Sequence, residues 1–106
     1  MQAVRLFQGY LWHPREAPLD PKALLPEEVE GARLLLDEVP PPVPFFEDGT
    51  PTAGQRFYQL TLLALSEAPP EALKPLAERV AEVLKPLLEG LPQGVGWLLL
   101  EDLRPL

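Results

Sequence analysis

The sequence contains no cysteine, which excludes disulfide bonds, thiolate nucleophiles and sulfur-ligated metal sites. It has a single histidine, His13, and a single serine, Ser66, so few side chains are available for acid–base or nucleophilic catalysis. No hydrophobic run approaches the roughly 18–20 residues that span a membrane, and the N-terminal stretch is typical of a strand and not of a signal peptide. We therefore expect a cytoplasmic protein.

Asparagine and isoleucine are also absent, whereas the chain has fifteen prolines. Few thermolabile residues and many prolines are typical of a heat-adapted protein, and a genomic coding bias is the other explanation. The 106 residues are 46% hydrophobic and carry a net charge of −7, which predicts one acidic globular domain spanning residues 1–106. The negative charge disfavours nucleic acid and anionic membranes as partners.

Hydrophobic periodicity predicts an α+β fold. Alternating patterns predict strands over residues 3–12 and 55–66, and the nearly continuous apolar run of residues 94–103 predicts a buried strand. A helical stripe predicts a helix over residues 26–39, with a strand over 32–39 as the alternative, and a clearer stripe predicts a helix over 70–91. With a short strand near residues 40–51, this order predicts a four-stranded antiparallel or mixed sheet with two helices on one face, in the ferredoxin-like (split βαβ) order β-α-β-β-α-β.

The second predicted helix has a defined apolar face. We expect this face to pack on leucines of the second and last long strands. The expected contacts are Leu76, Val80, Leu84 and Leu87 of the helix against Leu60, Leu62, Leu98 and Leu100 of the strands.

The segment EVPPPVPFFEDGTP, residues 38–51, is the most unusual in composition. Its prolines cannot donate ladder hydrogen bonds, so we interpret it as an edge strand that ends in an Asp-Gly turn. Adjacent Phe45 and Phe46 would point to opposite faces, and only one could reach the core. We therefore predict a homodimer through residues 40–51, with Val43, Phe45 and Phe46 at the interface. The alternative is that the loop of residues 13–25 covers the spare ring within the same chain.

The candidate catalytic residues gather near the end of the first strand. His13 could act as a general base oriented by Glu16, in a small-molecule pocket lined by Tyr10, Trp12 and Arg15. The competing interpretation is a histidine with no chemical role at a strand end. Carboxylate pairs at 47–48 and 101–102 lack the spacing of known metal sites, and no glycine-rich phosphate loop precedes a helix, so we expect no metal and no cofactor.

The aromatic residues on the predicted strands also suggest an RNA-binding alternative. Phe7, Phe57 and Tyr58 accompany Arg5 and Arg56 there, but the spacing differs from the usual RNA-recognition signature. The favoured hypothesis is a non-enzymatic module that self-associates or binds a protein partner. The alternative is a small-molecule-binding protein or enzyme with the pocket around His13, whose ligand the sequence does not identify.

Overall fold

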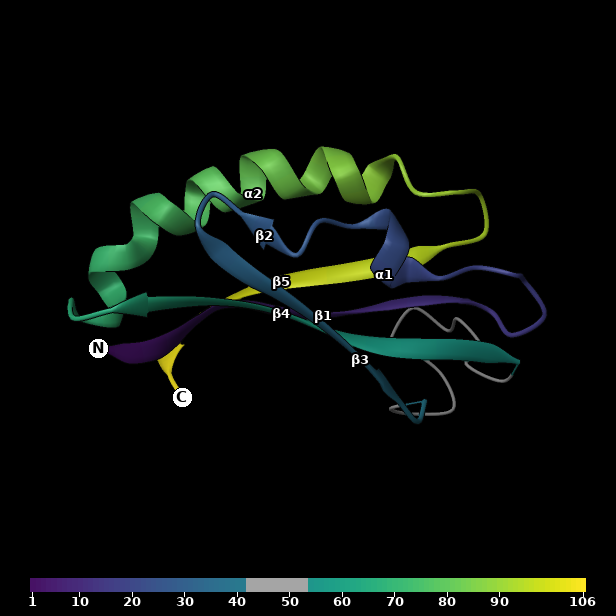
Figure 1. Cartoon of the computed structure of the whole chain (residues 1–106), viewed down its shortest axis with the longest axis horizontal. Coiled ribbons are helices and arrows are strands. Elements are labelled where there is room, and N and C mark those ends of the chain that lie inside the picture. The colour runs from purple at the N-terminus through teal and green to yellow at the C-terminus, as the bar shows by residue number, and fades with distance from the viewer. Residues whose placement is uncertain (42–53) are drawn as a thin grey trace.

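The computed structural model, which describes residues 1–41 and 54–106, shows a five-stranded antiparallel sheet with one long helix across one face (Figure 1). The strand order is β2-β3-β4-β1-β5. The elements are β1 (Gln2–Pro14), α1 (Pro21–Leu24), β2 (Glu28–Val29), β3 (Ala32–Val39), β4 (Gln55–Ser66), the 3-10 turn η1 (Pro70–Leu73), α2 (Lys74–Glu89) and β5 (Gly96–Pro105). None of the helices in the described residues is both long and apolar enough to cross a membrane.

Helix α2 forms as its sequence pattern predicts. Pro75 lies in its first turn, where a proline removes no helical hydrogen bond, and the preceding residues form η1 instead of a regular turn. Its apolar stripe is buried against the sheet through Ala77, Val80, Leu84 and Leu88. The sheet supplies the other half of this core through alternate residues of its strands, including Leu11, Leu34, Leu36, Leu60 and Leu62.

The strand β1 lies at the centre of the sheet, between β4 and β5, and is antiparallel to both. Its register shifts by one residue between Arg5 and Phe7, which is a β-bulge. Gly9 permits a close approach between β1 and β5, since an added Cβ would lie 1.8 Å from the carbonyl oxygen of Leu98.

The predicted helix over residues 26–39 is wrong. This segment is the hairpin of β2 and β3, joined by Glu30 and Gly31, whose φ angles are 51° and 84°. Positive φ at both turn residues matches the type I′ turn that suits a two-residue hairpin, so Gly31 serves the turn. The alternative, a strand over residues 32–39, is confirmed with those bounds.

The predicted ferredoxin-like arrangement of four strands and two helices is therefore wrong, because the sheet has five strands and one main helix. The leucine-rich stretch at residues 34–36 is compatible with a helical stripe and with a period-two strand equally. The strand contains alternating buried and outward residues, with Leu34 and Leu36 buried and Asp37 exposed.

The strand β5 also differs from expectation, since it lies at an edge of the sheet and pairs only with β1. Leu98 and Leu100 are exposed and do not contact α2; instead Trp97, Leu99 and Leu103 pack against the core. On the helix, Leu84 and Val80 are buried as expected, whereas Leu87 is 40% exposed.

Candidate functional site

His13 lies inside β1 and is fully buried, on the face of the sheet that α2 covers. Its ring stacks on that of Tyr58 with centroids 5.6 Å apart and an interplanar angle of 21°. Nδ1 lies 2.8 Å from the carbonyl oxygen of Pro14, which can only accept, so Nδ1 donates and Nε2, 3.3 Å from the Tyr58 hydroxyl, accepts. Both ring nitrogens are thus occupied by structural hydrogen bonds.

The pKa of the Tyr58 hydroxyl is raised from its ordinary value, first by burial and then by the nearby Glu38 carboxylate. A tyrosine hydroxyl is protonated at neutral pH, and the raised pKa extends this range to higher pH, which matches its role as donor to Nε2 of His13. The pair therefore satisfies two buried polar groups within a largely apolar layer.

The residues of the predicted pocket around His13 are not brought together on one side. Successive strand residues point to opposite faces, so Tyr10 and Trp12 lie on the face opposite His13. Arg15 and Glu16 follow the strand in an exposed turn. Among the aromatic residues of the RNA-binding alternative, Phe57 likewise lies on the opposite face from Phe7 and Tyr58.

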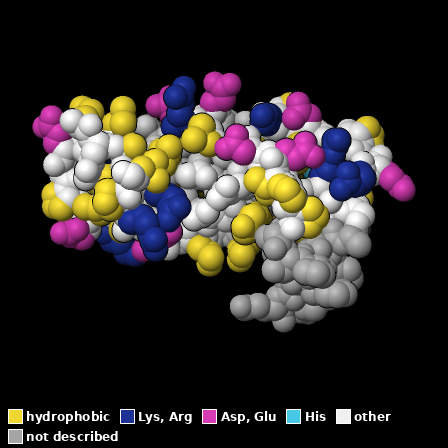
Figure 2. Space-filling model, turned by 90° about the horizontal axis from the view of Figure 1, so that it is seen from below, with side chains coloured by type: hydrophobic (Ala, Val, Ile, Leu, Met, Phe, Trp, Pro, Cys, Tyr) yellow, Lys and Arg dark blue, Asp and Glu magenta, His cyan; other side chains and the backbone are white. Residues whose placement is uncertain are grey.

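The face of the sheet opposite α2, which we call the open face, carries a second set of side chains. Register and alternation place apolar residues of four strands there. These are Tyr10, Trp12, Leu35, Leu63, Leu65, Phe57, Leu98 and Leu100. Leu65, Leu98 and Leu100 are 71%, 38% and 56% exposed. Figure 2 views the molecule from this side and shows groups of hydrophobic side chains interspersed with basic and acidic ones.

One end of the open face holds an aromatic pair. Trp12 stacks on buried Phe57, with ring centroids 5.7 Å apart and planes 24° apart. Gly96 lies opposite Trp12 on β5, and an added Cβ there would lie 2.2 Å from the indole ring. Glycine at this position therefore allows the indole to lie across the neighbouring strand.

Toward the other end of the open face, Asp102 bridges two arginines. It accepts hydrogen bonds from Arg5 at 2.5 Å and from Arg104 at 2.7 Å. Arg5 is the more buried of the two, with its side chain 17% exposed against 64% for Arg104. The carboxylate thus compensates adjacent cations that would otherwise repel each other across β1 and β5.

On the covered face, a separate ion pair joins α2 to β5, between Lys74 and Glu101. The hydrogen bond to this carboxylate raises the pKa of the Lys74 ammonium. Glu101 and Asp102 are therefore each engaged with a cation, on opposite sides of the sheet. Among the described residues, no group of three or more histidine or acidic side chains is placed to hold a metal ion.

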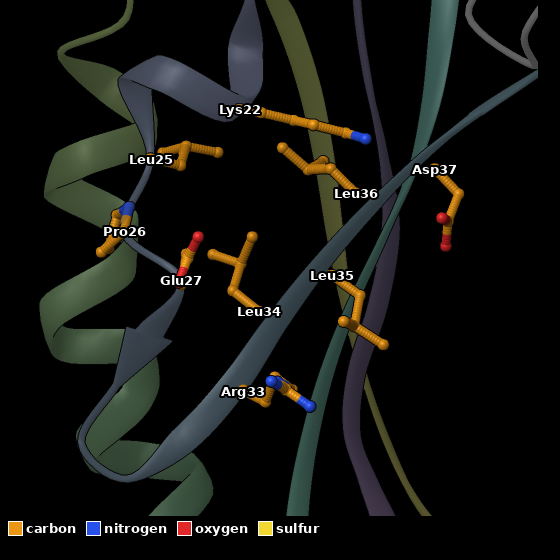
Figure 3. Close-up of a pocket in the computed structure, with 9 residues that line it drawn as sticks. All are labelled: Lys22, Leu25, Pro26, Glu27, Arg33, Leu34, Leu35, Leu36 and Asp37. Atoms are coloured by element: carbon orange, nitrogen blue, oxygen red, sulfur yellow. The ribbon is translucent and has the colours of Figure 1, made fainter.

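A groove of about 340 Å³ runs beside the edge of the sheet, between the chain that leads into β2 and the strand β3 (Figure 3). One wall is Lys22, Leu25, Pro26 and Glu27, and the other is residues 33–37 of β3. In Figure 3, Leu34 and Leu36 point toward the first wall, whereas Leu35 and Asp37 point to the opposite side of β3.

The whole chain, residues 1–106, matches the model of a family described as "Protein of unknown function (DUF3208)". The chain belongs to the DUF3208 family. No curated protein matched it. The description of DUF3208 names no activity, so the functional argument must come from the surfaces above.

The sequence analysis predicted neither the open face nor the groove. The signal for the open face was present in the apolar run of β5, which was interpreted as a strand covered on both sides. The groove had no local signal, because it forms between residues 22–27 and β3, and the favoured prediction placed residues 26–39 in one helix. Val43, Phe45 and Phe46, the predicted interface residues, lie outside the described residues, and their role stays a prediction.

Proposed function

We propose that this protein is a self-associating module in which the open face of one copy packs on the open face of a second copy. The observation that carries the proposal is the composition of β5. Strands that are covered on both faces have nearly continuous apolar runs, whereas strands with one solvated face alternate. Residues 97–100 of β5 are all apolar, yet α2 covers only one face, which leaves Leu98 and Leu100 exposed.

Charge supports a second copy as the occupant. In the five strands, the charged residues on the open face are Arg5, Arg33, Arg104, Glu28, Asp37 and Asp102. Three positive and three negative groups sum to zero, so the net charge of −7 belongs to the rest of the chain. Two copies repel each other through most of their surfaces but not through this one.

The dimensions of the face also suit a dimer. The five strands contain 13, 2, 8, 12 and 10 residues. At about 3.3 Å per residue and about 4.8 Å between strands, they make a face on the order of 700 Å². That area is close to what each partner contributes to a standard protein interface, about 800 Å². Removing Leu98 and Leu100 from water would contribute to the free energy of association.

The test is the oligomeric state of three proteins in sedimentation velocity runs at micromolar concentration. We expect the wild type to be a dimer and Leu100→Asp to be a monomer, because the substitution places an unpaired charge within the interface. The matched control is Leu87→Asp, at a leucine of similar exposure on α2, outside the open face. It should remain a dimer.

Salt gives an independent check, since screening weakens the repulsion between two acidic copies. The dimer should therefore become tighter as ionic strength rises. A wild type that stays monomeric throughout the micromolar range would refute the proposal. A dimer weakened equally by Leu100→Asp and Leu87→Asp would refute the assignment of the open face.

A further inference from the structure

The strand β3 is paired unequally on its two sides. On one side it pairs with β4 from Arg33 to Val39, whereas on the other β2 reaches only Ala32 and Arg33. The last bond on that second side is the one from the Leu34 N–H to the Glu27 carbonyl, at 2.9 Å. Beyond Leu34, the edge of β3 continues without a neighbouring strand in the described residues.

Antiparallel geometry fixes which main-chain groups lie free on this edge. Alternate residues direct both N–H and C=O to the same neighbouring strand. Because Leu34 directs its N–H to Glu27, Leu36 and Glu38 direct theirs to the same side. No main-chain hydrogen bond satisfies these groups of Leu36 and Glu38 within the part of the chain that the structure describes.

The chain that leads into β2 leaves this edge open. From Glu27 toward the N-terminus, this chain passes through Pro26 and Leu25 to α1. The N-terminus of α1 is capped by the Asp20 carboxylate, which accepts a hydrogen bond from the Lys22 N–H at 3.2 Å. The departure of this chain from β3 creates the groove of Figure 3. Its floor is apolar, with Leu25, Leu34 and Leu36 almost fully buried.

We propose that this groove takes an extended, basic peptide segment of a different protein, which adds to β3 as an edge strand. An extended backbone supplies donors and acceptors at the spacing of about 7 Å that separates Leu36 from Glu38. Hydrogen bonds between the peptide backbone and the N–H and C=O groups of Leu36 and Glu38 would satisfy these free groups.

A second copy of this chain fits the edge poorly. The antiparallel two-fold register that pairs Leu36 with Glu38 sets Asp37 directly opposite its own copy, and like charges in that position are destabilising. The register that pairs Leu36 with Leu36 sets Glu38 opposite Leu34, whose N–H is already bonded to Glu27. The register that pairs Glu38 with itself sets Leu36 opposite Pro40, which has no N–H.

The charges at the edge specify the composition of the peptide. Asp37 and Glu38 are both exposed at the free end of β3, and the whole chain is acidic. The Glu38 carboxylate lies 3.4 Å from Nε of Arg56, so Asp37 is the acidic group at this edge that is left to attract a basic ligand. A lysine or arginine opposite Asp37 would be attracted there, and the next residue, opposite Leu36, would face the apolar floor near Leu25. The expected segment therefore has basic residues followed by a branched apolar one.

The test uses the capped peptide Ac-Lys-Lys-Val-Thr-Val-NH2 and the ¹⁵N-labelled protein, followed by NMR. In the free protein, the amide protons of Leu36 and Glu38 should exchange fast with water, and those of Leu35 and Asp37, bonded to β4, slowly. Titration should shift the Leu36 and Glu38 resonances saturably and slow their exchange. The same peptide N-methylated at its first valine should not bind, since it lacks the donor that faces Leu36.

Two protein variants separate main-chain pairing from charge. Glu38→Pro removes the outward N–H and should lower the affinity about tenfold or more, whereas the matched Glu38→Ala keeps the N–H and should bind within a few-fold of wild type. Adding Leu100→Asp to the wild type should leave peptide binding unchanged, because the open face is a separate surface.

Three results would overturn the proposal: slow exchange of Leu36 and Glu38 in the free protein, no saturable shift at millimolar peptide, or equal binding of the N-methylated peptide. The last comparison holds even where Glu38→Pro fails to fold.

Discussion

The two faces of the sheet carry similar side chains in different surroundings. The covered face packs its leucines and Tyr58 against α2, and its one buried polar side chain in the described residues, His13, is hydrogen-bonded. The open face also carries leucines and a tyrosine, yet Leu65 and Leu100 are more than half exposed. Composition alone therefore does not show which face of the sheet belongs to the core. The position of α2, which covers one face, shows it.

The difference also explains how the chain can be stable and retain an apolar surface. Burial beneath α2 supplies the folding free energy, so the leucines of the open face need not contribute to it. Exposed leucines without a stabilising role in the monomer are typical of interaction surfaces. Three predictions test this contrast between the faces.

Truncation of a leucine should have the largest effect, and it should differ most between the faces. Leu84→Ala leaves a cavity under α2 and should lower the free energy of unfolding by about 2–5 kcal/mol. Leu100→Ala, on the open face, should change it by less than about 1 kcal/mol in dilute monomer. Urea unfolding followed by tryptophan fluorescence measures both, and similar losses for the two variants would contradict the assignment of the core.

Removal of a tyrosine hydroxyl should have the next largest effect. Tyr58→Phe leaves Nε2 of buried His13 without a donor and should lower the free energy of unfolding by about 1–2 kcal/mol. Tyr10→Phe is the matched control on the open face, where the ring is partly exposed to water, and should change stability by less than about 0.5 kcal/mol. Equal values for both tyrosines would show that the bond to His13 contributes nothing.

The sequence was sufficient to predict the elements whose hydrophobic pattern fits only one type of secondary structure. Helix α2 was predicted because its leucines and charges separate at helical spacing over sixteen residues, and β4 was predicted with its exact bounds. Residues 26–39 have two solutions, because Val29, Ala32 and Leu36 fit a helical stripe and also lie on one side of a hairpin. Only the sheet decides between them, since β4 offers β3 a full ladder of hydrogen bonds.

The sites could not be predicted for the same reason. Tyr10, Trp12 and His13 are close in sequence, and the prediction of one pocket assumed a loop where β1 in fact continues to Pro14. Inside a strand, the side chains of successive residues point to opposite faces of the sheet, so residues close in sequence do not form one pocket. Conversely, Arg5 and Asp102 are far apart in sequence, and no local pattern could pair them.

The smallest effect concerns pH and belongs to the covered face alone. The Tyr58 hydroxyl has an ordinary pKa of 10.0 in the unfolded chain, and burial raises its pKa in the folded protein. As pH rises, the unfolded chain therefore loses this proton first, which stabilises the unfolded state. The contribution of Tyr58 is fully present below pH 10.0 and is lost as pH rises through the folded pKa. The difference in stability between wild type and Tyr58→Phe should then stay constant up to about pH 9 and shrink between about pH 10 and about pH 11. A difference that stays constant over this range would mean that the folded protein does not hold the Tyr58 proton more tightly than the unfolded chain does.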